Sequence, residues 1–199
     1  DIVKLLSKVN PYDSNIILGH SRLITNGLAD NQPVIRDDIC AIHNGIIVND
    51  EAIWQKLGTE RRFKIDSEAI VAIAESVINN DGSFSDIPKK VLEMCQGVVA
   101  CALLLPKYGK LILFSNNGSL YIGYEENNIY FASARYALDQ IGVNKIEQIK
   151  NNSIILDIPA SDVAFDIHDD KVRIENLIPD FVYNKLEKKL LQYKPIAFK

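Results

Sequence analysis

The stretch Ile39-Cys-Ala-Ile-His-Asn-Gly-Ile-Ile-Val-Asn49 is the part of the sequence around which the rest is organised. Two runs rich in β-forming residues flank the dipeptide Asn44-Gly45. This pattern is a strong signal for a β-hairpin, because Asn and Gly both tolerate the positive φ of a type I′ turn. A second interpretation is open. A Gly backbone N–H beside an Asn side-chain amide can direct two donors at one oxygen, as an oxyanion hole does. On this dipeptide alone, the turn is favoured.

Composition predicts one globular domain with a substantial core, since 47% of the 199 residues are hydrophobic. The longest apolar run, Val98 to Leu105, is far shorter than a membrane span. The net charge of −4, with no basic cluster, favours neither nucleic acid nor a membrane as a partner. The chain begins with Asp1 and has no signal peptide. We therefore expect a cytoplasmic protein and a piece of a longer gene product.

The pattern of elements predicts an α+β fold with mostly antiparallel sheets, because helices come early and short strands with tight connections follow. Three helices are expected first. One is capped by Asn49 or Asp50 and ends at Gly58, one begins at Asp66-Ser67, and one runs from Ser85 or Asp86 to Cys95. A short strand at 16–19 and a polar loop at 28–38 precede them. The later elements expected are strands at 97–105, 110–115, 120–124, 129–132, 153–158, 163–167 and 171–175, and helices at 136–141 and 180–193.

Segment 20–27 has the spacing H-x-R-x-x-T-x-G, which contains Arg22 and Thr25. An Arg guanidinium is suited to bidentate recognition of a carboxylate, and a nearby Thr hydroxyl can add a hydrogen bond. For either residue taken singly, a surface Arg or a Thr in a turn is the favoured interpretation.

Asp66 also has two interpretations. It can cap the helix that follows, or it can be the anion that pairs with the ammonium group of a substrate. Taken alone, the capping role is favoured.

The histidines and cysteines offer no alternative chemistry. His20, His43 and His168 lack zinc-ligand spacing, so each is predicted to be structural, and we expect neither a metal nor a cofactor. The three cysteines contain no CxxC pair, and their odd number argues against a disulfide framework. Buried small hydrophobic side chains are the favoured interpretation for all three, namely Cys40, Cys95 and Cys101.

Four segments in combination resemble the class II glutamine amidotransferase domain, the N-terminal-nucleophile type found in glucosamine-6-phosphate synthase and related sugar amidotransferases. They are 19–27, Asn31-Gln32-Pro33, 43–49 and Asp66-Ser67-Glu68. The resemblance covers about residues 15 to 160, and segments 118–123 and 131–133 fit its second half more loosely.

The resemblance implies an Ntn-hydrolase-type four-layer αββα sandwich, here without its N-terminal strands, that hydrolyses glutamine to glutamate. Arg22 and Thr25 would bind the α-carboxylate of glutamine, supported by Asn26. Asp66 would bind the α-ammonium. Asn44 and Gly45 would stabilise the oxyanion formed when the carboxamide is attacked.

Three departures from the family pattern stand out. Leu23-Ile24 replaces the commoner Trp-Ala, and Asn26 replaces a frequent His. The family nucleophile is an N-terminal Cys followed by Gly, and no Cys-Gly pair occurs in this sequence. We therefore expect the nucleophile to lie in a missing segment, and the chain alone to be inactive.

The expected organisation is an amidotransferase domain at 1–178, followed by a helix and linker at 179–199. The linker would lead to a synthetase, isomerase or transferase domain that passes ammonia to a sugar acceptor. Two alternatives remain open: a non-catalytic amidotransferase-like binding or scaffold domain, and an Ntn hydrolase that acts on another amide.

Overall fold

The computed structural model describes residues 15–21, 30–125 and 128–159, all of which belong to one compact unit, Ser14–Ala164. The strands predicted at 163–167 and 171–175, and the helix predicted at 180–193, lie outside these residues.

A five-stranded antiparallel sheet is the centre of the described structure, with the strand order β1-β2-β3-β4-β8. Its alternating side chains are buried on both faces along most of β3, which explains why that sequence is continuously apolar. The strands are β1 (Val34–Arg36), β2 (Ile39–Ile47), β3 (Gly97–Leu105), β4 (Lys110–Ser115) and β8 (Asn152–Asp157).

The predicted hairpin at Asn44-Gly45 is wrong, because both residues lie inside β2. Asn44 is paired with Ala100 and Gly45 with Val99, in a ladder that runs without a turn to the end of β2. The nine-residue strand β3 offers a partner for the whole run. Strand pairing with this partner therefore overrides the local turn preference of the dipeptide.

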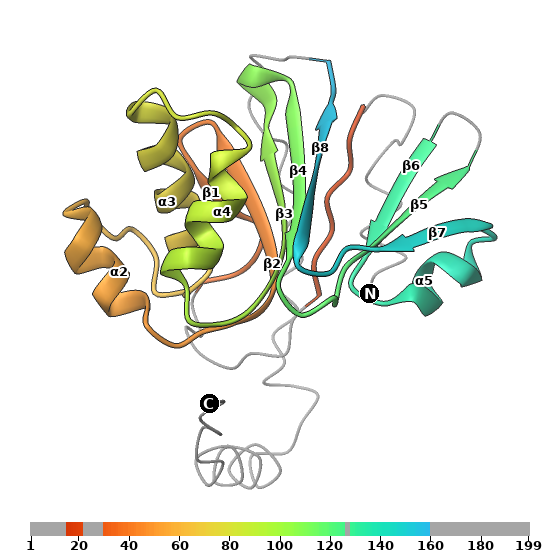
Figure 1. Cartoon of the computed structure of the whole chain (residues 1–199), viewed down its shortest axis with the longest axis horizontal. Coiled ribbons are helices and arrows are strands. Elements are labelled where there is room, and N and C mark those ends of the chain that lie inside the picture. Colours follow the sequence, from red (N-terminus) through yellow and green to blue (C-terminus); the bar gives the residue numbers. More distant parts are fainter. Residues whose placement is uncertain (1–14, 22–29, 126–127, 160–199) are drawn as a thin grey trace, which may run out of the picture. The chain divides into compact units, whose positions relative to one another are not determined.

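Three helices cover one face of this sheet (Figure 1). Helix α2 (Asp50–Leu57) ends at Gly58, whose left-handed conformation lets its N–H donate to the carbonyl of Trp54. Helix α3 (Glu68–Asn79) is buried along its first two turns, and its apolar residues pack with one face of β2, β3 and β4 in a single core. Helix α4 (Asp86–Met94) contacts α3 and contributes Ile87 and Val91 to the same core.

A second antiparallel sheet, with the order β6-β5-β7, lies on the other side of the first (Figure 1). Helix α5 contacts β6 and β7 and completes the layer order helix, sheet, sheet, helix. This order confirms the predicted α+β architecture. The elements are β5 (Tyr121–Glu125), β6 (Asn128–Ala132), β7 (Lys145–Gln148) and α5 (Arg135–Gln140), and a 3-10 turn, η2 (Pro106–Tyr108), joins β3 to β4.

The remaining differences from the sequence predictions concern short edge elements. No strand forms at the predicted position 16–19 within the described residues 15–21. The predicted loop 28–38 contains the short strand β1, and β7 was not predicted. These strands are three or four residues long, so their periodicity is too brief to detect from sequence.

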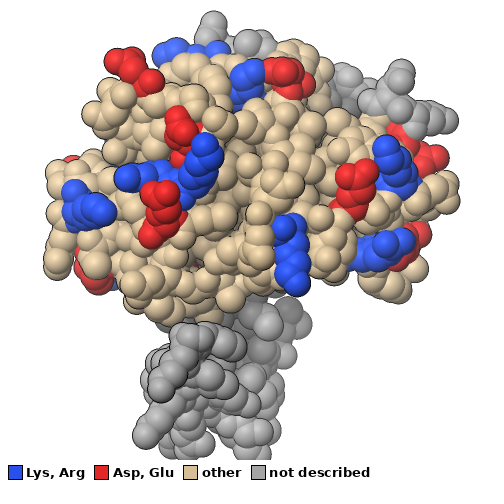
Figure 2. All heavy atoms as spheres, viewed as in Figure 1, with Lys and Arg blue, Asp and Glu red and all other residues tan. Residues whose placement is uncertain are grey.

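The surface of the described residues carries mixed charge. On the face shown in Figure 2, acidic and basic side chains alternate over the helix layer and again over the second sheet. In the part of the chain that the structure describes, no helix has the length and apolar character needed to cross a membrane.

Candidate active site

Asn44 and Gly45 lie on an exposed stretch near the end of β2. Ile39, Ala41 and Ile47 belong to the core beneath the helices. Side chains alternate along a strand, so Gly45 shares that face, whereas Asn44 lies on the opposite face. Both are exposed, unlike most of β2. The candidate oxyanion-hole dipeptide is therefore accessible to a ligand.

Close approach of the two strands requires glycine at this place. A Cβ on Gly45 would lie 1.9 Å from the carbonyl oxygen of Val98 and 2.7 Å from Nε2 of His43. Gly97 on β3 has the same relation to β2, since its Cβ would lie 2.1 Å from the carbonyl oxygen of Ile46. The end of the β2–β3 ladder is thus free of side chains at two positions on facing strands.

Asp66 reaches the same strand from the helix layer. Its Oδ2 accepts a hydrogen bond from the backbone N–H of Ile47 at 2.8 Å, and the residue is 6% exposed. The predicted capping role is wrong. Ser67 is the N-cap residue of α3 and makes no side-chain capping bond, while Asp66 contributes only its backbone carbonyl, to the N–H of Ala69. A hydrogen bond to an ionised acceptor stabilises by about 1.5–3 kcal/mol, at least as much as a cap.

His43 connects the two candidate elements from inside the core. Its Nε2 lies 3.0 Å from the carbonyl oxygen of Val98, and its Nδ1 lies 3.0 Å from Oγ of Ser67. A carbonyl oxygen only accepts, so Nε2 carries the proton. Burial lowers the pKa of His43, against opposing effects of the Val98 hydrogen bond and the Asp66 charge. The ring is therefore neutral near pH 7, and Nδ1 accepts from the Ser67 hydroxyl.

This assignment leaves one oxygen of Asp66 without a strong partner among the described residues. Ser67 has a single hydroxyl proton, and its distance to Oδ1 of Asp66 is 3.4 Å, longer than its distance to His43. The proton goes to the shorter contact. Oδ1 of Asp66 then has only this long contact among the described residues.

Two further side chains hold β2 on either side of the dipeptide. Gln32 bonds both polar backbone groups of His43: its Oε1 accepts from the N–H at 2.6 Å and its Nε2 donates to the carbonyl at 2.9 Å. Asn49 donates to the carbonyl of Met94 and accepts from the N–H of Gln96. Asn49 was predicted as a possible helix cap; it is the N-cap residue of α2, but its side chain makes no capping bond and contacts the segment before β3 instead. The role of Gln32 was not predicted, because its partner His43 is 11 residues away in sequence.

The other predicted ligands of glutamine are not placed. Arg22, Thr25 and Asn26 lie outside the described residues. Within the described ranges, no group of three His, Cys, Asp or Glu side chains is arranged to hold a metal ion.

The three cysteines are buried, as predicted, and none forms a disulfide. Burial raises the pKa of Cys40 and of Cys95 to about 12, and raises that of Cys101 well above its ordinary value. Thiols in this state are poor nucleophiles, since the thiolate is the reactive form.

A family model described as "Glutamine amidotransferase domain" matches residues 20–140, more than half of the chain. This chain belongs to the glutamine amidotransferase family. The match includes Asn44, Gly45 and Asp66, and it confirms the resemblance inferred from the sequence segments.

Curated relatives of this amidotransferase chain are enzymes named glutamine–fructose-6-phosphate aminotransferase (isomerizing). The protein from Zymomonas mobilis is 27% identical over 173 residues, which cover 83% of this chain and 28% of the relative. The protein from Campylobacter jejuni is 30% identical over 140 residues, covering 65% of this chain and 23% of the relative. The chain thus spans about a quarter of the length of these relatives.

Solved structures share the fold. Glutamine phosphoribosylpyrophosphate amidotransferase from B. subtilis, complexed with ADP and GMP, has a TM-score of 0.57 at 24% identity, over 69% of this chain and 32% of that one. A structure described as the allosteric regulatory enzyme of purine biosynthesis has a TM-score of 0.51 at 22% identity, over 63% and 29%. The fold is therefore of the predicted Ntn-hydrolase type.

Replacing Gly45 by Ala tests the close approach of β2 and β3. The added Cβ would overlap the Val98 carbonyl, so the strands must separate, and we expect the free energy of unfolding to fall by about 2 kcal/mol or more. Gly19→Ala is the control, because nothing lies within 4 Å of a Cβ there. Urea unfolding measures both, and equal stability of the two variants would contradict the observed approach.

His43→Gln tests the buried neutral ring. The folded pKa of His43 is below its ordinary value, so the unfolded chain takes up a proton first as the pH falls. The stability contribution is present above about pH 6.5 and is lost as the pH falls toward the folded pKa. Between pH 7.5 and 5.5, the free energy of unfolding should therefore decrease more steeply in the wild type than in His43→Gln, by up to about 1.4 kcal/mol per pH unit. Identical slopes would show that His43 has the same pKa in the folded and unfolded chain, which would contradict the buried neutral ring.

Proposed function

We propose that this chain is the glutamine-binding part of a glutaminase, which hydrolyses glutamine to glutamate and supplies ammonia to a sugar acceptor. One observation carries the proposal. The carboxylate of Asp66 is hydrogen-bonded to the strand that presents Asn44 and Gly45, so the groups suited to an ammonium and to an oxyanion belong to one connected unit.

Asp66 binds the α-ammonium of glutamine in this proposal. A carboxylate has about four acceptor positions, and the bond to the N–H of Ile47 occupies one of them. That bond also fixes the carboxylate before the ligand arrives, so little conformational freedom is lost on binding. The remaining oxygen, Oδ1, receives the ammonium protons.

Asn44 and Gly45 act on the other end of the ligand. Attack on the carboxamide carbon places negative charge on its oxygen, and the Asn44 amide and Gly45 N–H donate to that charge. A rigid strand is a good support for these donors, because their positions then change little during the reaction. Gln32 and Asn49 hold this part of β2 from both sides.

Arg22 and Thr25 complete the binding of glutamine at its α-carboxylate, with Asn26 in support. The guanidinium forms two parallel hydrogen bonds to the carboxylate, and the hydroxyl adds a third. These roles rest on the family segments, since the three residues lie outside the described structure.

The nucleophile comes from a segment outside the 199 residues. Burial and raised pKa values make Cys40, Cys95 and Cys101 unsuited to attack a carboxamide. The chain as given therefore binds glutamine without hydrolysing it. The names of the curated relatives support an amino-sugar product, and the acceptor site belongs to a linked isomerase, synthetase or transferase domain.

Asn44→Ala and Asp66→Asn in the full-length protein distinguish the two ends of the site. Asn44→Ala should lower kcat for glutamine hydrolysis by about a hundredfold with little change in KM, because its donor matters only once the oxyanion forms. Asp66→Asn should raise KM by about tenfold, since the neutral amide keeps an acceptor for the N–H of Ile47 but loses the charge. Asn128→Ala, exposed on β6, is the control and should leave both constants unchanged.

Steady-state glutaminase assays measure these constants. If Asn44→Ala and Asp66→Asn both raise KM and spare kcat, Asn44 is a binding residue and the oxyanion assignment is wrong. If the full-length wild type hydrolyses no glutamine, the domain is a binding or scaffold module.

A further inference from the structure

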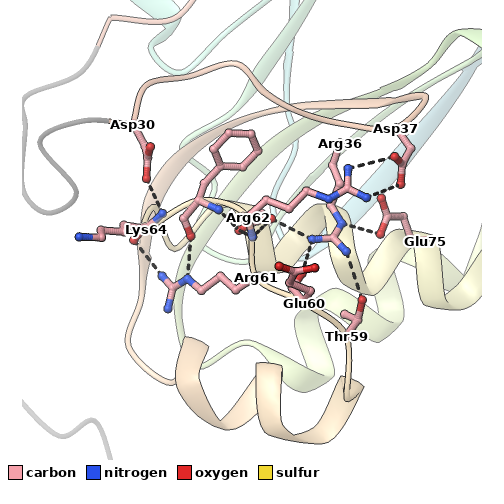
Figure 3. A network of polar contacts seen from close by, with 11 residues as sticks. Asp30, Arg36, Asp37, Thr59, Glu60, Arg61, Arg62, Lys64 and Glu75 are labelled. Carbon is pink, nitrogen blue, oxygen red and sulfur yellow. Dashed lines mark hydrogen bonds and ion pairs between the residues drawn. The ribbon is translucent and has the colours of Figure 1, made fainter.

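Residues 59–66 lie between α2 and α3 and contain no helix or strand. Asp66 is the last residue of this segment. Backbone N–H and carbonyl groups without ladder partners must bond to side chains or water. Two buried side chains from outside the segment, Arg36 and Glu68, supply several of those bonds. Asp30 and Arg61 bond other backbone groups of the segment (Figure 3).

Glu68 accepts hydrogen bonds from backbone N–H groups of this segment. Its two carboxylate oxygens accept from the N–H of Arg62 at 2.9 and 3.2 Å and from the N–H of Phe63 at 2.8 Å. Glu68 is fully buried, and it lies only two residues after Asp66, in the first turn of α3. The side chain thus closes a short ring of backbone, 63–68, that has Asp66 within it.

Arg36 donates hydrogen bonds to oxygen atoms of this segment. Its Nη1 donates to the carbonyl of Glu60 at 2.8 Å and to Oε1 of Glu68 at 2.9 Å, and its Nη2 donates to the hydroxyl of Thr59 at 3.2 Å. Its Nε donates to Glu75 at 2.7 Å. Arg36 is 4% exposed and ends β1, which pairs with β2. It therefore ties the segment to the sheet that presents Asn44.

A purely stabilising role does not explain this arrangement well. Burying two charges costs desolvation energy that a pair often fails to recover, so buried pairs are poor stabilisers compared with apolar residues. The surface pair between Arg62 and Asp37 shows the contrast, because it is exposed and bonds no backbone group. Glu68 instead makes most of its hydrogen bonds to the backbone that leads to Asp66. Arg36 adds one backbone bond, to the carbonyl of Glu60, and a bond to Glu68 itself.

We propose that Glu68 and Arg36 are positioning residues for Asp66. They fix the path of residues 59–66 so that the Asp66 carboxylate stands against β2 and meets the α-ammonium of glutamine. This inference rests on the proposed glutaminase function. It assigns to the pair a role in recognising the ammonium group, and none in the attack on the carboxamide.

Glu68→Gln in the full-length protein tests the inference. The amide replaces one acceptor oxygen by a donor, so at least one bond to Arg36, Arg62 or Phe63 is lost. We expect KM for glutamine to rise by about tenfold with kcat unchanged. Arg62→Gln is the matched control, since it removes the surface pair with Asp37 and keeps the backbone N–H that Glu68 binds.

A ligand without the ammonium separates positioning from general destabilisation. Glutaramate, which is glutamine without its α-amino group, cannot contact Asp66 through an ammonium. We expect the ratio of the inhibition constant of glutaramate to the KM for glutamine to fall about tenfold in Glu68→Gln and to stay at the wild-type value in Arg62→Gln. Steady-state glutaminase assays with glutaramate as the competitor measure this ratio, and an unchanged ratio in Glu68→Gln would overturn the inference.

Arg36→Lys serves if Glu68→Gln does not fold, because Lys keeps the positive charge and loses the fork that holds Glu60 and Thr59. The same fall in the ratio is expected, and an unchanged ratio would overturn the inference.

Asp66→Asn distinguishes failure of the positioning role from failure of the proposed function. If Asp66→Asn lowers the ratio while the other variants do not, only the positioning role is wrong. If Asp66→Asn leaves it unchanged, the ammonium site itself is wrong.

Discussion

The hydrogen bond from the N–H of Ile47 to the carboxylate of Asp66 is the interaction on which the candidate site depends. It joins the start of α3 to the strand that carries Asn44 and Gly45, and it is buried, so water competes with it little. A buried carboxylate depends on hydrogen bonds to offset its loss of water. The bond to Ile47 therefore stabilises the domain and also fixes the position of the Asp66 carboxylate, whose second oxygen has only a long contact to Ser67 among the described residues.

Polar side chains around this bond determine the positions of its two partners. His43 and Ser67 link β2, β3 and the first turn of α3, while Gln32 bonds the backbone of His43. Apolar packing between α3 and the sheet supplies most of the burial, and it tolerates small shifts. Directional hydrogen bonds tolerate such shifts less, so they fix the positions of Asp66 and β2 more precisely than the apolar packing does.

Local sequence patterns predicted the regular elements well, and the predicted bounds of β3 and β4 are those observed. These patterns failed where contacts between residues distant in sequence determine the local structure. Asn44-Gly45 has the strongest local turn signal in the chain, yet pairing with β3 keeps it in a strand. Asp66 precedes a helix, so a local rule predicted a cap, while its true partner lies 19 residues earlier. The bond between Arg36 and Glu68 spans 32 residues and has no sequence signal at all. Asn44, Gly45 and Asp66 are predicted as site residues only by the combination of family segments, because each residue taken alone has a more common structural explanation.

A crystal structure of the full-length protein with bound glutamate, the product of the proposed reaction, tests the central claim most directly. Glutamate retains the α-ammonium and is not turned over. The expected result is an ammonium nitrogen within about 2.7–3.2 Å of the Asp66 carboxylate, with a side-chain carboxylate oxygen at the same distance from the Asn44 amide. Glutamate ordered elsewhere in the domain, or bound with its ammonium away from Asp66, would contradict the claim.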